Sequence, residues 1–172
     1  MKENKKTQIP KNETLSIIDE KFLELKKSNK LGLMPFIMAG DPNIEITAKI
    51  LLKLQEKGAD LIELGIPYSD PLADGPIIQL SASRALRSGT TLKKVIELLE
   101  SLKEKLHIPI ILFTYFNPIL NFGLENFCEL ASKVGVAGLI IPDLPLEESY
   151  KFSELISSYF IDLILLAAPT TS

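Results

Sequence analysis

Two carboxylates occur in the stretch Leu61-Ile-Glu-Leu-Gly-Ile-Pro-Tyr-Ser-Asp-Pro-Leu-Ala-Asp-Gly-Pro-Ile-Ile-Gln79, from which the fold and the chemistry of this chain can be approached. Glu63 interrupts an apolar run that ends at Gly65, a pattern typical of a buried strand in a parallel sheet. Burial of an ionisable group in such a strand costs free energy, so the group is expected either to have a partner or to take part in a reaction. Glu63 is therefore a candidate for chemistry, and the alternative is a carboxylate that is hydrogen-bonded for structural reasons.

The segment after this strand is predicted to be a shaped loop that carries Asp74. Prolines fix the backbone φ angle and glycines allow conformations closed to other residues. Both types punctuate this segment, at Gly65, Pro67, Pro71, Gly75 and Pro76. A shaped loop after a strand is where α/β folds place their active sites. Sequence separation does not bring Asp74 to Glu63, so their approach requires a loop that curls back over the carboxyl end of the strand.

The rest of the chain alternates short apolar runs with segments of helical hydrophobic spacing. Besides the strand in the opening stretch, we expect strands at 32–38, 110–114, 139–141 and 161–167. Helices are expected from residue 14 to about 27, and at 44–57, 78–87, 91–105, 124–134 and 146–159, with a loop at 115–123. Five β/α repeats with short connections indicate a parallel sheet with right-handed crossovers. The repeats fit either a fragment of a (β/α)8 barrel or an open, five-stranded, doubly wound sheet.

Composition narrows the class of protein. The chain has 172 residues, 46% of them hydrophobic, and a net charge of −3, which favours one globular α/β domain over residues 14–172 behind a polar tail at 1–13. A chain with this net charge lacks the excess of basic residues that binding to nucleic acid or to an anionic membrane requires, so neither is expected as a partner. We expect no membrane span and no secretion signal, and thus a cytoplasmic or plastid location. Cys128 is expected to be a buried hydrophobe, and His107, the single histidine, to lie away from the active-site loops.

Several motifs together resemble those of the tryptophan synthase alpha subunit. The match is densest over the opening stretch, and further pieces follow in the family's order at Met34–Pro42, Thr114–Pro118, Ile140–Glu148 and Ala168–Ser172. The resemblance extends from about Leu31 to the last residue. It implies an α/β fold of the (β/α)8 TIM-barrel type, of which about the first five β/α units are present as a partial catalytic domain.

The resemblance also implies a reaction and a set of site residues. The family cleaves indole-3-glycerol phosphate by a retro-aldol reaction to indole and glyceraldehyde 3-phosphate in tryptophan biosynthesis. Glu63 and Asp74 match the catalytic carboxylates, and Phe36 and Tyr115 match residues that line the indole pocket. No metal and no cofactor are expected in this chain, whereas pyridoxal phosphate is expected in the beta subunit of an alpha2beta2 tetramer.

Other expectations concern the partner and the extent of the chain. Pro67, Asp70 and Asn117 match surfaces that meet the beta subunit, and Asp143 is expected to support the loop that carries Asp74. The family's phosphate-binding loops are not within the 172 residues, so we expect the native chain to continue and residues 1–172 alone to be unstable. Two alternatives are a non-catalytic module that only binds the beta subunit and another barrel that acts on a sugar phosphate.

Overall fold

The structure, a computed structural model, describes residues 15–167, so the predicted tail and the motif at 168–172 lie outside the described part. Seven helices are present there: α1 (Ile17–Lys27), α2 (Ile44–Glu56), α3 (Pro76–Arg87), α4 (Leu92–Leu102), α5 (Phe116–Phe122), α6 (Leu124–Lys133) and α7 (Leu146–Ser157). Five strands alternate with them: β1 (Phe36–Met38), β2 (Ile62–Gly65), β3 (Ile110–Phe113), β4 (Val136–Ile140) and β5 (Asp162–Ile164). The predicted β/α alternation is confirmed.

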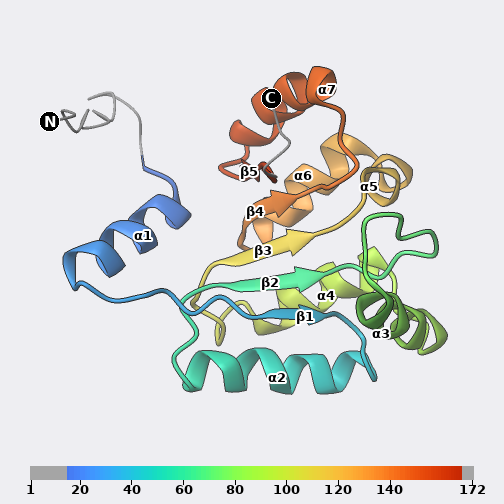
Figure 1. Cartoon of the computed structure of the whole chain (residues 1–172), viewed down its shortest axis with the longest axis horizontal. Helices are drawn as coiled ribbons and strands as arrows, with labels where there is room; N and C mark the ends of the chain where they lie inside the picture. The colour runs from blue at the N-terminus through green and yellow to red at the C-terminus, as the bar shows by residue number, and fades with distance from the viewer. Residues whose placement is uncertain (1–14, 168–172) are drawn as a thin grey trace, which may run out of the picture.

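All five strands form one parallel sheet in the order β1-β2-β3-β4-β5. A doubly wound sheet reverses its strand order at a switch point, and this sheet does not. The open, doubly wound alternative is therefore wrong, and the sheet has the sequential winding of a barrel. Figure 1 shows α3 and α5 near the arrowheads of the strands, which are the carboxyl ends where barrel enzymes place their sites.

The outer face of the sheet carries the main hydrophobic core. Side chains that alternate along the strands, such as Ile62, Leu64 and Leu112, are almost completely buried there. They pack against the apolar faces of α2, α4, α6 and α7. Helix α4 supplies the most regular stripe, because its apolar residues recur at helical spacing and six of its eleven residues are buried.

The opposite face, called here the inner face, is also apolar but is covered only in part. Its side chains include Leu61, Ile111, Phe113, Ala137, Ile140 and Ile164. Helix α1, which begins at a Ser16–Asp19 capping box, inserts Ile18 among them near the amino ends of the strands. In a closed barrel this face is the packed interior.

Several predicted bounds were wrong, and three of them have a local reason. The loop at 115–123 contains α5, because Pro118 falls in the first helical turn, where its missing N–H leaves no hydrogen bond unmade. The first strand begins at Phe36 and not at 32, because the Leu33 amide donates to the Asp60 side chain, at 2.8 Å. Strand β4 already begins at Val136, with a register shift opposite Ile110 and Ile111.

The last strand is also shorter than predicted, at Asp162–Ile164. Cys128 is buried, as its helical setting predicted. Among the helices of residues 15–167, none has the length and apolarity that a membrane crossing requires.

Candidate active site

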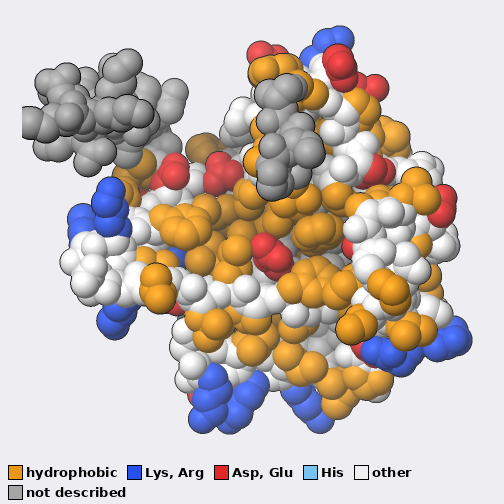
Figure 2. All heavy atoms as spheres, viewed as in Figure 1, with side chains coloured by type: hydrophobic (Ala, Val, Ile, Leu, Met, Phe, Trp, Pro, Cys, Tyr) orange, Lys and Arg blue, Asp and Glu red, His pale blue; other side chains and the backbone are white. Residues whose placement is uncertain are grey.

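Glu63 lies near the middle of the inner face. In the sheet register it stands beside Phe36 of β1 and Ile111 of β3. Burial raises the pKa of its carboxyl group above the ordinary value, because desolvation disfavours the charged form. Within residues 15–167 its side chain makes no hydrogen bond and no ion pair, so the structural alternative of a hydrogen-bonded carboxylate is not supported. Figure 2 shows an acidic side chain surrounded by apolar surface over the strands.

Two aromatic rings meet beside Gly65, the next residue after Glu63 on this face, because the glycine leaves room for them. Phe36 and Phe113 meet edge to face, with ring centroids 5.8 Å apart. Gly65 follows Glu63 on the same face of β2, and a Cβ at this position would lie 2.7 Å from Cζ of Phe36. Phe36 was predicted as a substrate-binding residue, whereas Phe113 was missed. Phe113 stands opposite Gly65 in the sheet register, and a large ring opposite a glycine on the neighbouring strand is the signal that could have identified Phe113.

Asp74 lies at the end of the loop after β2, two residues before Pro76 begins α3. Its amide donates to the Pro71 carbonyl at 3.2 Å, and its own carbonyl accepts from the Gln79 side chain at 2.8 Å. Burial raises the pKa of the Asp74 carboxyl, and a hydrogen bond with the Tyr115 side chain partly offsets that rise. The predicted shaped loop is therefore a structured segment with internal hydrogen bonds.

Tyr115 connects this loop to the carboxyl end of β3. Its ring is buried, and its hydroxyl oxygen accepts a hydrogen bond from the Ala73 amide at 2.9 Å. Burial of the phenol raises the pKa of Tyr115, and the Asp74 carboxylate adds to that rise, so the hydroxyl stays protonated and can donate to Asp74. The structure thus brings Tyr115 and Asp74 together, a contact that sequence reasoning did not foresee.

The residues predicted to meet a partner surround the same loop. Asp70 and Asn117 are exposed, and the Asn117 amide donates to the Tyr68 hydroxyl at 3.1 Å. Pro67 is buried, so the prediction of partner contact rests on the other two residues. Asp143 was expected to support the Asp74 loop, but its carboxylate accepts from the Phe116 amide at 2.9 Å instead and thus holds the start of α5.

A metal centre has no basis in the described residues, because no group of three or more His, Cys, Asp or Glu side chains in 15–167 could hold an ion. The site consists instead of two carboxyl groups, two phenyl rings that meet edge to face and a buried tyrosine, which come from β1, β2, β3 and the segments that follow β2 and β3. Carboxyl groups whose pKa values are raised keep their protons to higher pH than ordinary carboxyl groups, which favours their use as general acids and bases. This arrangement suits proton transfer to and from a flat, apolar substrate.

Comparisons with known proteins agree on one family. The family model described as tryptophan synthase alpha chain matches residues 22–172. The tryptophan synthase alpha chain of Prochlorococcus marinus subsp. pastoris is 88% identical over 171 residues, which are 99% of this chain and 61% of that relative.

Two solved structures share the fold. Tryptophan synthase subunit alpha from Legionella pneumophila str. Paris has a TM-score of 0.88 and 38% identity over 92% of this chain and 61% of that one. An open form of tryptophan synthase from M. tuberculosis, with BRD0059 bound, has a TM-score of 0.87 and 30% identity. This match covers 92% of this chain and 64% of that one. The chain therefore spans about three fifths of the length of the relatives that it matches.

Proposed function

This chain belongs to the tryptophan synthase alpha chain family, and from that premise we propose that, at the full length of its relatives, it cleaves indole-3-glycerol phosphate to indole and glyceraldehyde 3-phosphate. The observation that carries the proposal is the position of Glu63, an unpaired and desolvated carboxyl group at the centre of an apolar face. Family membership gives no support to a barrel acting on a different sugar phosphate. No feature of the site favours the non-catalytic module.

Glu63 is proposed as the acid and base of the cleavage. A proton must be added to indole C3, and another must be removed from the hydroxyl group on the carbon attached to C3. When the carbon–carbon bond breaks, its electrons return to the ring and the hydroxyl-bearing carbon becomes the aldehyde. A carboxyl group whose pKa is raised by burial can supply the first proton and accept the second.

Asp74 is proposed to stabilise the intermediate by charge. Protonation at C3 places a positive charge on the indole ring, and a carboxylate that accepts a hydrogen bond from the indole N–H opposes that charge directly. Its link to Tyr115 supports this role, because the tyrosine hydroxyl orients the carboxylate and holds it at the carboxyl end of β3. Phe36 and Tyr115 are proposed to line the indole pocket.

The proposed partner is the tryptophan synthase beta subunit, with pyridoxal phosphate bound there and not in this chain, in an alpha2beta2 tetramer that receives the indole. Asp70, in the loop after β2, and Asn117, in the first turn of α5 after β3, are both exposed, which supports a contact surface at the mouth of the site. A complex at this mouth would place the partner next to the released indole.

The assignment of Glu63 is tested by Glu63→Gln in the full-length chain, built where needed by fusing residues 1–172 to the remaining C-terminal part of the Prochlorococcus marinus relative. Loss of an acid–base group should reduce kcat for indole release by about 10²- to 10⁴-fold, with little change in the urea unfolding midpoint. The matched control is Glu129→Gln on the exposed surface of α6. Cleavage by Glu63→Gln at the rate of the control would rule out the proposed role.

A further inference from the structure

Helix α3 differs from the other crossover helices in how it is held. The connection from β2 to β3 contains two helices, and α4 alone belongs to the outer core. The buried residues of α3, Ala82 and Ala85, form a separate small cluster with Met38 and Phe36 of β1. Because α3 starts two residues after Asp74, any rotation or shift of this helix would move that carboxylate.

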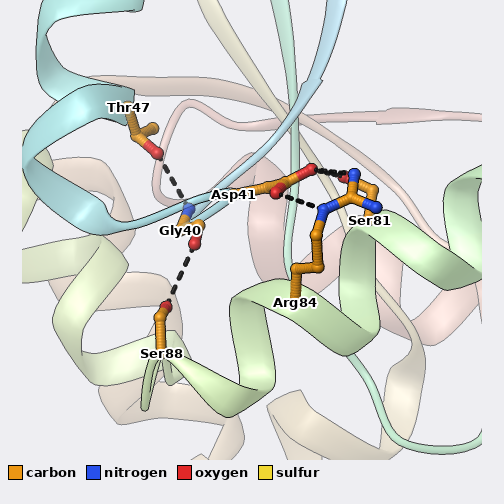
Figure 3. Close-up of polar contacts among 6 residues, drawn as sticks. All are labelled: Gly40, Asp41, Thr47, Ser81, Arg84 and Ser88. Atoms are coloured by element: carbon orange, nitrogen blue, oxygen red, sulfur yellow. Dashed lines mark hydrogen bonds and ion pairs between the residues drawn. The ribbon is translucent and has the colours of Figure 1, made fainter.

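A polar cluster attaches α3 to the loop after β1, as Figure 3 shows. The Arg84 guanidinium donates two hydrogen bonds to Asp41, from Nε to Oδ1 at 2.8 Å and from Nη2 to Oδ2 at 2.6 Å. The Ser81 hydroxyl donates to the same carboxylate. A bidentate pair of this kind fixes direction as well as distance. The Arg84 hydrogen bond also lowers the pKa of Asp41, so the carboxylate stays ionised.

The loop that carries Asp41 is itself fixed at Gly40. The Gly40 amide donates to Oγ1 of Thr47 on α2 at 2.8 Å, and its carbonyl accepts from the Ser88 hydroxyl at 3.0 Å. Gly40 also has a φ of +84°, and a Cβ there would lie 1.9 Å from Oγ1 of Thr90. The β1 loop is therefore held from α2 through Thr47, and the C-cap residue of α3, Ser88, joins the same loop, so Asp41 has a defined place from which it can orient Arg84.

We propose that Asp41 and Arg84 are a positioning pair that sets the place of the Asp74 carboxylate. The inference rests on the proposed function of Asp74. On the β3 side, the loop 66–75 is held by the Tyr115 hydroxyl at Ala73 and by Asn117 at Tyr68. On the β1 side, no hydrogen bond in the described residues joins this loop directly to the loop after β1, whereas α3, which follows it, is bonded to Asp41 through Arg84 and Ser81. Misplacement of a reacting group by about 1 Å can reduce a rate by about 10²-fold.

A general stabilising role predicts a different result from a positioning role. The Arg84 side chain is 51% exposed, and half-exposed ion pairs contribute little to global stability. Breaking the pair should therefore change the loop and the turnover number while the unfolding midpoint stays close to that of the parent. Substrate binding should change less than turnover, because Asp74 opposes a charge that develops only after protonation of the ring.

The test uses the full-length chain described above and two variants of Arg84. Arg84→Met removes both hydrogen bonds, whereas Arg84→Lys keeps the positive charge but cannot form the bidentate pair. Arg87→Met in the last turn of the same helix is the matched control. Two readouts are measured: kcat and KM for indole release, and hydrogen exchange of the Ala73 and Asp74 amides. We expect Arg84→Met to lower kcat by about 10- to 100-fold at nearly constant KM and to speed this exchange. Arg84→Lys should fall between Arg84→Met and the parent.

Unchanged exchange in the Asp74 loop of Arg84→Met, or equal effects of Arg84→Met and Arg87→Met, would overturn the proposal. A parent protein that releases no indole would refute the proposed function, and the exchange measurement would still decide whether the pair positions the loop. Asp41→Asn gives an independent check, because it removes the pair from the other side and should speed exchange of the same amides.

Discussion

The two faces of the sheet are both apolar, yet they are built differently. On the outer face the strand side chains pack against helices, and Leu64 and Leu112 are completely buried. On the inner face, the row through Phe36, Glu63 and Ile111 combines an aromatic ring, a carboxyl group and an aliphatic side chain. The outer face thus contributes stability, whereas the inner face contains groups that a stable core would not include.

This difference indicates where function is located in the chain. Consecutive residues of one strand, Glu63 and Leu64, point to opposite faces of the sheet, and only Leu64 on the outer face is the kind of side chain that a core contains. A carboxyl group in an apolar face, with no hydrogen-bonding or charged partner in the described residues, departs from the rule for a packed core. Departures of this kind are expected at functional sites. Matched substitutions on the two faces of the full-length chain should therefore separate stability from activity.

The largest stability effect is expected on the outer face. Leu112→Ala should reduce the free energy of unfolding by about 2–5 kcal/mol, because it leaves a cavity in a fully packed core. The neighbouring inner-face substitution Phe113→Leu should lose less than about 1.5 kcal/mol and should mainly raise KM. Urea unfolding and steady-state kinetics measure the two effects. Equal losses of stability would remove the distinction between the faces.

A smaller loss of stability is expected from Gly65→Ala, which tests whether the space at Gly65 is needed to place the Phe36 ring. The new methyl group would lie 2.7 Å from the Phe36 ring and 3.3 Å from the Met38 side chain, so the ring must move. We expect a loss of about 1–3 kcal/mol together with a raised KM. Gly75→Ala is the control, since a Cβ there meets no atom within 4 Å. A wild-type KM in Gly65→Ala would show that the position of Phe36 is unimportant.

Much of this arrangement could be predicted because it depends on local patterns. Alternation of apolar runs and helical spacing gave the five parallel strands, and the resemblance to the tryptophan synthase alpha subunit is confirmed. The carboxylate within the second strand could be identified because a single polar residue in a buried strand is visible without knowledge of its neighbours. The choice between barrel-like and doubly wound order came from the resemblance, since spacing alone is the same in both.

The rest depends on contacts between residues far apart in the chain. Arg84 meets Asp41 across 43 residues, and Tyr115 meets Ala73 across 42. Such pairs are set by strand register and helix orientation, which local propensity does not determine. Helix α5 was missed for a different reason, because the Asn-Pro sequence at 117–118 is typical of a turn and is also compatible with a first helical turn.

The smallest effect expected is a pH dependence of opposite sign for two carboxylates, Glu63 at the site and Asp41 in the positioning pair. The pKa of Glu63 is raised in the folded state, so between the unfolded and folded pKa values the folded state binds more protons. Stability from this group therefore falls as pH rises through that window. The pKa of Asp41 is lowered, so its contribution is present above the unfolded value and is lost as pH falls through the folded one.

The two variants Glu63→Gln and Asp41→Asn separate these contributions when urea midpoints are measured from about pH 2 to pH 7, a range that extends to both sides of the ordinary carboxyl pKa values. Relative to the parent, Glu63→Gln should gain stability as pH rises, because the parent alone must ionise a desolvated group. Asp41→Asn should instead lose stability relative to the parent as pH rises, since the parent alone gains the ionised partner of Arg84. Parallel pH profiles for the two variants would mean that both carboxylates serve the same structural purpose, and the functional distinction between them would fail.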